Sequence, residues 1–229
     1  MKRKPSCSTA CPTRRSEKAL DPARTDRGQQ VRDVALSMFV KEGFGNVSLR
    51  HLGQRVGVHA GSLYHHVESK QALLFELIHE HLENMVDAMA RRTRKTATAG
   101  AKLSIFVRIH LEFQIHQQEC AQLLGLELRS LDDAYRAQIQ PLLARHRSYL
   151  TEIITAGVAS EIFVAQPIPT SVNALLGMLG SVAFWFREGH QPFEELVKQM
   201  TAMIFGLLCP PAQKADPSLS IGCRPHAAS

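Results

Sequence analysis

The feature that most constrains the fold of this chain is its hydrophobic period, which is about 3.6 residues almost throughout. Val31, Val34, Ala35, Met38 and Phe39 show the spacing i, i+3, i+4, i+7 and i+8, which is typical of an amphipathic helix. No segment keeps the alternation of a half-buried strand for long. The sequence therefore predicts an all-α protein.

Helix start and stop signals divide the chain into a series of helices. The first helix is expected to begin at an N-cap, Asp26, with Gln29 three residues on, and to end near Gly43. A long helix is expected after Ser69, over residues 70–91. A later helix contains Pro141, which is expected to kink or split it. The other expected elements are helices over 102–117, 119–130, 133–156, 171–187 and 192–208, and a loop over 166–170.

The formal net charge of +6 is concentrated near the N-terminus. Residues 1–30 contain eight Lys and Arg against three Asp and Glu, whereas residues 31–80 contain five of each sign. Prolines and charged residues are frequent in residues 1–24, and prolines recur in 210–229, so both segments are expected to be disordered tails. A basic arm of this kind either follows DNA phosphates or enters a minor groove, or is simply a solvated tail.

The cysteines and the apolar segments exclude several classes of protein. The chain has five cysteines, an odd number, and four of them lie in or next to the tails, so a disulfide framework is not expected. There is no secretory signal and no apolar run of about 20 residues, so we expect a cytoplasmic protein without a membrane span. Without a glycine-rich phosphate loop or a nucleophile elbow, neither enzyme activity nor a cofactor is predicted.

Two short helical units lie between the first helix and the long helix. Ser48 is a suitable N-cap for a unit over residues 49–55, and a second unit is expected over residues 59–66. Between them, Gly57 can adopt the positive φ of a sharp turn. Two short helices joined by about three residues that include a glycine are typical of the helix-turn-helix motif, whose second helix enters the major groove of DNA.

This segment, within residues 25–74, resembles the DNA-binding domain of the TetR family of bacterial transcriptional repressors. Three positions depart from the family pattern: Val56 replaces the usual Ala, His59 replaces Ser or Thr, and Val67 replaces Phe. The resemblance rests on residues that stand at the spacings of that family, namely Ala35, Phe39, Gly43, Phe44, Ser48, Gly57, Val58, Gly61, Ser62, Leu63, Tyr64, Ser69 and Lys70.

The resemblance and the chemistry of DNA grooves together assign roles within the motif. Ser48, Tyr64 and Lys70 are expected to hold phosphates and to fix the register on the duplex. Arg50, Ser62 and His65 are candidates for hydrogen bonds to base edges or to neighbouring phosphates. The full set of candidate DNA-binding residues is Ser48, Arg50, His59, Ala60, Gly61, Ser62, Tyr64, His65 and Lys70.

The resemblance also implies a DNA-binding domain over residues 25–70 and an effector-binding and dimerisation domain over residues 71–209. The helices over 171–187 and 192–208 are expected to form a homodimer interface, because the first is apolar on nearly all sides. A loose similarity to regulators of acyl-CoA or lipid-like ligands suggests a small apolar effector that releases a repressor from a palindromic operator. Candidates for lining the effector pocket are Phe106, His110, Phe113, Tyr149 and Trp185.

Two other functions stay open on the sequence. The pairs Glu76 with His79 and His116 with Cys120 have helical spacings that could begin a metal site, so a metal-sensing regulator is one alternative. A helical protein-interaction module without specific DNA binding is the other. The favoured hypothesis, without a metal site, is a ligand-responsive regulator that binds double-stranded DNA.

Overall fold

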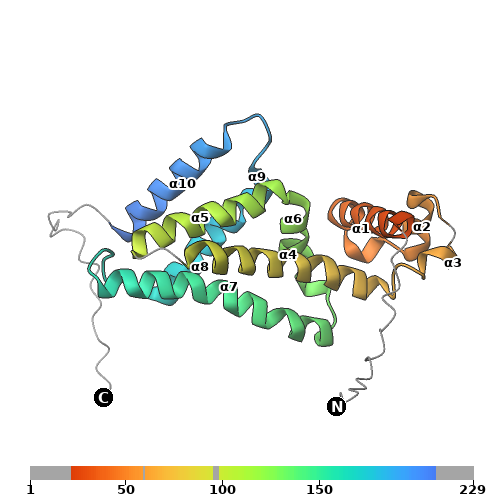
Figure 1. Ribbon diagram of the computed structural model, residues 1–229, viewed down its shortest axis with the longest axis horizontal. Coiled ribbons are helices and arrows are strands. Elements are labelled where there is room, and N and C mark those ends of the chain that lie inside the picture. The colour runs from red at the N-terminus through yellow and green to blue at the C-terminus, as the bar shows by residue number, and fades with distance from the viewer. Residues whose placement is uncertain (1–21, 59, 95–97, 210–229) are drawn as a thin grey trace, which may run out of the picture.

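The computed structural model describes residues 22–58, 60–94 and 98–209 of the chain, and every regular element in these ranges is a helix. The all-α prediction is therefore confirmed. A small head lies at one end of the molecule (Figure 1). It consists of α1 (Pro22–Glu42), the short 3-10 helix η1 (Phe44–Asn46), α2 (Leu49–Val56) and α3 (Ala60–Leu63).

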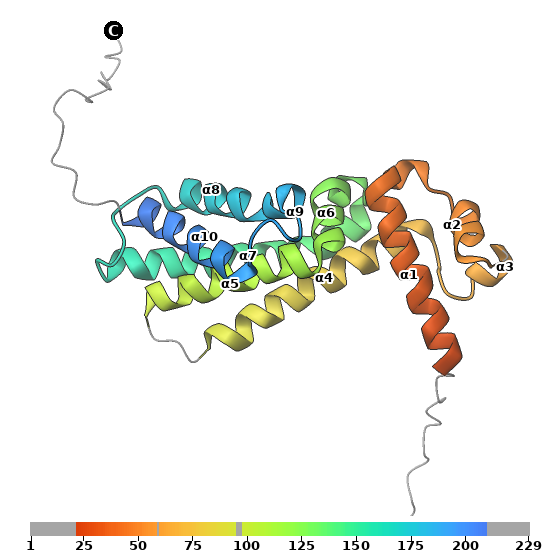
Figure 2. The same cartoon turned by 90° about the horizontal axis from the view of Figure 1, so that it is seen from above.

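The long helix α4 (Lys70–Thr93) leads from the head into a larger helical body. In the body, α4 packs against α5 (Ala99–His116) and α7 (Asp133–Ala159), which also pack against each other. Helix α6 (Gln118–Glu127), followed by η2 (Leu128–Ser130), contacts α1 of the head. Figure 2 shows the remaining helices on the opposite side of α5 from α4. They are α8 (Ile168–Gly180), α9 (Val182–Trp185) and α10 (Phe193–Leu208).

Side-chain caps at the predicted positions set several of these boundaries. The Ser48 Oγ accepts a hydrogen bond from the backbone N–H of His51 at 3.1 Å, and the Ser69 Oγ accepts one from that of Ala72 at 2.9 Å. Each cap satisfies a backbone donor that has no partner within the helix. Gly57 ends α2 with a φ of 76°, which a residue with a Cβ adopts only with strain. The start of α2, its end and the start of α4 are therefore determined locally.

The first helix is longer than the sequence predicted. It begins at Pro22, four residues before Asp26, so Asp26 lies inside the helix and is not its N-cap. Residues 22–24, assigned to a disordered arm, belong to this helix. Proline is compatible with a first helical turn because its missing N–H has no partner there. The remainder of the predicted arm and the tail over 210–229 lie outside the described residues.

Helix α7 continues without a break through Pro141, so of the two predicted outcomes, a kink or a split, the split is wrong. The missing N–H of Pro141 leaves the carbonyl oxygen of Ala137 without its helical partner. Both residues are exposed, so water can hydrogen-bond to that oxygen at little cost. The opposite error concerns residues 171–187, where one helix was expected and α8 and α9 are separated at Ser181. Helix α8 also begins within the expected loop, at Ile168.

A continuous apolar core extends from the head into the body. Phe39, Leu52 and Leu63 are fully buried in the head, and Ile78 and Phe106 are fully buried in the body. The first turns of α4 belong to the same cluster of buried residues as the head. The head therefore packs directly against the body.

The segment Ile168–Trp185 is the most apolar part of the described chain. Its 18 residues have a mean hydropathy of 1.3, which by length and composition would suit a membrane-crossing helix. The break at Ser181 divides it into α8 and α9, and Val172 and Leu179 on its inner face are buried in the core. Only 28% of the segment is buried within one protomer, however, which leaves an apolar outer face.

Candidate functional site

The packing of α2 and α3 leaves one surface of the head available for contact. Leu52 of α2 and Leu63 of α3 are completely buried, and the backbone N–H of Val58 in the turn donates to the Gly53 carbonyl oxygen at 2.9 Å. These contacts hold α3 against α2 with its apolar side inward. The predicted helix-turn-helix is therefore present, although the second helix is only four residues long and continues as a turn over residues 64–66.

Several predicted DNA-contacting residues lie on the outside of this motif. Arg50, Gly61 and His65 are exposed, and the Tyr64 side chain is 60% exposed despite its large ring. Ser48 is also exposed, and its hydroxyl can donate to a phosphate while its oxygen caps α2. His59 and the side chains of Ala60 and Ser62 lie outside the described residues.

The ammonium group of Lys70 points toward the head. It donates hydrogen bonds to the carbonyl oxygens of Phe44 and Val47, at 2.8 and 2.9 Å, and lies 4.1 Å from the centroid of the Phe44 ring. Burial lowers the pKa of Lys70, and the Glu127 carboxylate partly opposes this shift. Two of the three N–H donors of Lys70 are thus used within the head, which leaves one for a phosphate.

Polar contacts link the head to α4 and α6 of the body. Arg32 of α1 donates to Glu76 at 2.8 Å and also pairs with Glu80, one turn further along α4. The Glu127 Oε1 at the end of α6 accepts the backbone N–H of Phe44 at 3.0 Å. Through these contacts, the positions of α4 and α6 in the body determine the orientation of the head. Sequence reasoning missed them because the partners are 44 to 83 residues apart.

Two of the five predicted effector-pocket residues pack directly together, in the interior of the body. Phe106 and His110 of α5 are buried, with 6.0 Å between their ring centroids. Two further histidines, His146 of α7 and His81 of α4, are also buried and were not predicted. His146 stacks on Phe106 with 5.6 Å between centroids, while His81 meets Phe113 edge-on at 5.6 Å. Both missed histidines stand at apolar positions of helical periodicity, which is the signal that could have identified them.

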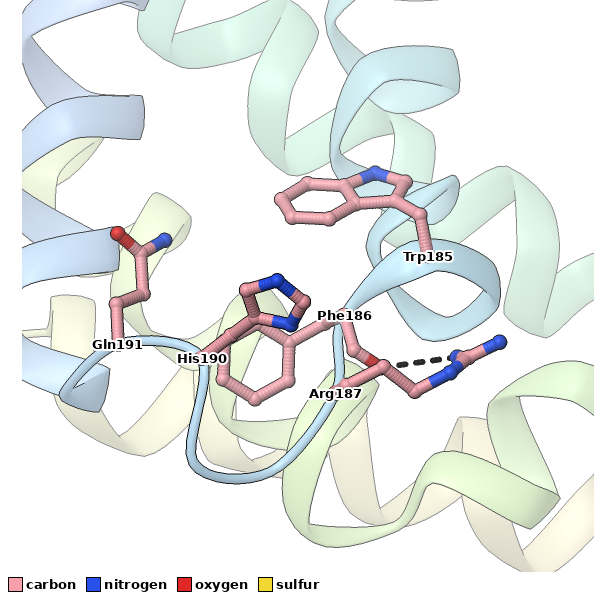
Figure 3. A pocket seen from close by; sticks show the side chains of 5 residues that line it. All are labelled: Trp185, Phe186, Arg187, His190 and Gln191. Atoms are coloured by element: carbon pink, nitrogen blue, oxygen red, sulfur yellow. Dashed lines mark hydrogen bonds between the residues drawn. The ribbon is translucent and has the colours of Figure 1, made fainter.

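Tyr149 and Trp185 line two separate cavities. Tyr149 borders a cavity of about 200 Å³ between the end of α4, the start of α5 and α7. Trp185 is 49% exposed and borders a surface pocket of about 300 Å³ beside the loop between α9 and α10. Figure 3 shows His190 and Gln191 around that second pocket, while the Arg187 guanidinium turns back to the Phe186 carbonyl oxygen at 3.1 Å. The structure does not place Trp185 with the buried aromatic residues of α5.

Burial keeps the imidazoles of His81, His110 and His146 uncharged at neutral pH. Burial, together with the charge of Arg147 and the proximity of His81, lowers the pKa of His146 to about 4. It also lowers the pKa of His110 well below 6.5, and His146 and His81 add to this effect. For His81, burial lowers the pKa and the hydrogen bond to Gln117 opposes the change. The interior is therefore polar in places but carries no charge from these rings.

The histidine pairs considered for a metal site have other partners. Glu76 is paired with Arg32, His79 lies 3.7 Å from the Glu83 carboxylate, and the His116 ring packs on Phe193. Among the residues that the structure describes, no three His, Cys, Asp or Glu side chains are placed so that they could hold a metal ion.

Comparison with known proteins agrees with this geometry. Residues 31–77 match the family model "Bacterial regulatory proteins, tetR family", and residues 96–208 match "Tetracyclin repressor-like, C-terminal domain". The Fatty acid metabolism regulator protein of Bacillus subtilis (strain 168) is 24% identical over 131 residues, which is 57% of this chain and 68% of that protein. The transcriptional activator FasR of Mycolicibacterium smegmatis is 26% identical over 162 residues, which is 71% of this chain and 73% of that protein.

The fold is likewise shared with solved structures. A bacterial regulatory protein of the tetR family from Rhodococcus RHA1 superimposes with a TM-score of 0.74 at 20% identity, covering 80% of this chain and 96% of that one. The two family models match the head and the body separately, in the order in which the structure arranges them. The chain belongs to the TetR family of bacterial transcriptional regulators.

Proposed function

We propose that this regulator is a repressor that binds a palindromic operator as a homodimer and is released when a small, largely apolar effector enters its body. The observation that carries the proposal is the attachment of an exposed helix-turn-helix to the ligand-binding helices. Arg32 and Glu127 fix the head to α4 and α6, so a change in the packing of these helices reorients the reading surface. The regulator would act in the cytoplasm, where it meets DNA.

The proposed DNA contacts divide into two kinds. Ser48, Tyr64 and the remaining donor of Lys70 would bind phosphates, which positions the head without reading sequence. Arg50 and His65 would contact base edges, and Gly61 would permit close approach. The residues from 48 to 70 carry three Lys and Arg and one Glu, a net charge of +2. Because this charge provides only a modest attraction to phosphates, stable binding requires that both heads of a dimer contact the DNA.

An apolar effector is supported by the composition of the body and by one relative. Phe106, Leu103 and Ile109 of α5 are completely buried, so the interior of the body around α5 is largely apolar. The name of the Bacillus subtilis relative refers to fatty acid metabolism, which agrees with an acyl or lipid-like ligand.

A homodimer is supported by apolar side chains that one protomer leaves exposed. Met203 and Leu207 of α10 are 56% and 59% exposed, and Phe184 of α9 is 41% exposed. Small exposed residues, Gly177 on α8 and Gly206 on α10, stand on the same outer stripes and allow helices to approach closely. We infer that these stripes meet their counterparts in a second copy, as expected from the sequence for the last two long helices.

A gel-shift assay with the DNA upstream of the regulator's own gene tests the proposal. The wild-type protein is expected to form a sequence-specific complex with this DNA. Acyl-CoA thioesters or fatty acids are expected to dissociate the complex. Tyr64→Phe should weaken binding to all sequences about equally, whereas His65→Ala should change the preferred sequence. The absence of any specific complex at moderate salt would contradict the DNA-binding function. A reporter fused to the same DNA decides the direction of regulation: repression requires higher expression when the protein is deleted.

A further inference from the structure

Three buried histidines in the body have hydrogen-bonding atoms that nothing in the described chain satisfies. His81, His110 and His146 are 2%, 4% and 8% exposed, and each comes from a different helix. The His81 Nε2, the His110 Nδ1 and the His146 Nε2 are buried and have no hydrogen-bond partner. Unpaired buried polar atoms are costly and rare, so three of them in one region require an explanation beyond core packing.

These residues form one group, here called the imidazole cluster. The His110 and His146 rings lie 5.2 Å apart, and both contact the Phe106 ring. His81 contacts Phe113 and Gln117 at the end of α5, one turn beyond His110 and its partner Gln114. The cluster therefore occupies the space where α4, α5 and α7 meet, with aromatic rings around it.

The neighbouring amides indicate what the free nitrogens can bind. The His81 Nδ1 lies 2.9 Å from the Oε1 of Gln117, which only accepts, so Nδ1 carries the hydrogen and the free Nε2 is an acceptor. The His110 Nε2 lies 3.3 Å from the Nε2 of Gln114, which only donates, so the free Nδ1 of His110 is a donor. An uncharged imidazole has one donor and one acceptor, so the cluster offers both and carries no charge. A hydroxyl group matches this set because it also donates and accepts.

The cavity beside Tyr149 lies one helical turn from the cluster. Its lining includes Arg94 after α4, Lys102 of α5, and Tyr149 and Glu152 of α7. Lys102 precedes Phe106 by one turn, and Tyr149 follows His146 by one turn, so the cavity and the cluster are consecutive along the same helices. Its volume of about 200 Å³ holds only part of a ligand. Two cations, Arg94 and Lys102, face one carboxylate, Glu152, so the net positive charge of the lining suits an acidic end group at the surface, from which the ligand's apolar body would extend toward the cluster.

We propose that the imidazole cluster binds a hydroxyl group of the effector, so that the ligand is a hydroxylated long-chain acid or its thioester and not the unsubstituted chain. This inference rests on the proposed effector-binding function and specifies its ligand. The hydroxyl accepts a hydrogen bond from the His110 Nδ1 and donates one to a neighbouring imidazole nitrogen. A saturated chain cannot satisfy any of these atoms, which gives the site its selectivity.

The test is calorimetric binding to the full chain without DNA. The probes are hexadecanoic acid and its 2-, 3-, 12- and 16-hydroxy derivatives, with their CoA thioesters as a second set. At least one hydroxylated probe is expected to bind about tenfold more tightly than its parent, as one or two well-placed hydrogen bonds allow. His110→Phe and His146→Phe should each remove this preference while leaving the parent acid bound. The control is His79→Phe, a half-exposed histidine of α4 outside the cluster, which should keep the preference.

Thermal unfolding of the ligand-free variants provides a second readout. Because phenylalanine removes the unsatisfied Nε2 of His146, His146→Phe should unfold at the same temperature as wild type or higher. His110→Phe also leaves the buried amide of Gln114 without its partner, so this variant is read only in the binding experiment. A clear fall in the unfolding temperature of His146→Phe, or a preference for the hydroxylated probe that survives in both variants, would overturn the inference. Equal binding of parent and hydroxylated acids would also overturn it, while leaving effector binding intact. Loss of the operator complex in the gel-shift assay, by contrast, would contradict the proposed function and not the ligand selectivity measured here.

Discussion

At the start of α4, the Lys70 ammonium lies between two backbone carbonyl oxygens and an aromatic ring. Its sequence position suggested a phosphate contact, whereas the structure gives it hydrogen bonds to the Phe44 and Val47 oxygens. These carbonyl groups lie in the turn immediately before Ser48, the cap of α2. Lys70 therefore holds the beginning of the helix-turn-helix to the first turn of α4, whatever it contributes to DNA binding.

We expect Lys70→Met to lower the free energy of unfolding by about 1 kcal/mol, because two buried carbonyl oxygens lose a charged donor while the apolar stem is retained. Operator affinity should fall as well, since the turn before α2 loosens. Denaturant unfolding followed by circular dichroism measures the first effect. Lys41→Met is the control, because Lys41 is 70% exposed and its removal should cost less than about 0.5 kcal/mol. Unchanged stability together with lost DNA binding would instead assign the ammonium wholly to a phosphate.

At the scale of elements, α6 connects the imidazole cluster to the head. Gln117, immediately before α6, binds His81, and Glu127 at the other end accepts the Phe44 N–H and the Ser130 hydroxyl. Ten residues of helix span about 15 Å, so α6 acts as a short rigid rod between the two regions. The contacts of Glu127 thus add α6 to α4, whose Glu76 and Glu80 pair with Arg32, as a connection between the body and the head.

Glu127→Ala should therefore reduce the response to ligand more than the binding of DNA. In the absence of ligand, we expect operator affinity within about threefold of wild type, because the reading surface is unaltered. The drop in affinity on adding effector should shrink by about fivefold or more, since typical coupling free energies are 1–3 kcal/mol. Gel shifts with and without ligand measure both values. Glu83→Ala, which removes an exposed carboxylate of α4, should leave the response unchanged, and an unchanged response in Glu127→Ala would exclude α6 as the connection.

The elements that could be predicted are those that local chemistry determines. The caps Ser48 and Ser69 and the turn glycine Gly57 act on backbone groups a few residues away, and each was found at its expected place. The continuity of α7 through Pro141 depends on which side of the helix faces water, which only the packing of the body decides. The imidazole cluster depends on the meeting of three helices distant in the sequence, so His81 and His146 carried no local signal beyond their apolar positions.

For the whole molecule, the buried histidines make stability depend on pH. Burial lowers the pKa of His146 from 6.5 to about 4 and lowers that of His110 in the same direction. The unfolded chain therefore binds protons before the folded one, so stability is complete above pH 6.5 and falls as the pH decreases toward 4. His146 alone accounts for a loss on the order of 3 kcal/mol by pH 4.

Urea unfolding at pH 7.5, 6.0 and 5.0 should show this decline for the wild-type chain. The His146→Phe variant should show a smaller decline, because its ring cannot be protonated. His116→Phe is the matched control, since His116 lies on the exposed end of α5. An equal pH dependence in His146→Phe and wild type would mean that other groups cause the acid sensitivity.

Two heads can bind one operator only if two protomers associate. The proposed interface consists of the exposed apolar residues on α8, α9 and α10. Leu207 and Met203 lie on the outer face of α10, where a second protomer would cover them. Leu207→Glu places a charge in this contact, and a buried unpaired carboxylate is strongly unfavourable. We expect the variant to be monomeric in size-exclusion chromatography with light scattering and to lose operator affinity by more than about tenfold, because one head contacts only one half-site. Ala137→Glu adds the same charge on the outer face of α7 and should remain dimeric. A Leu207→Glu variant that stays dimeric would place the interface elsewhere on the body.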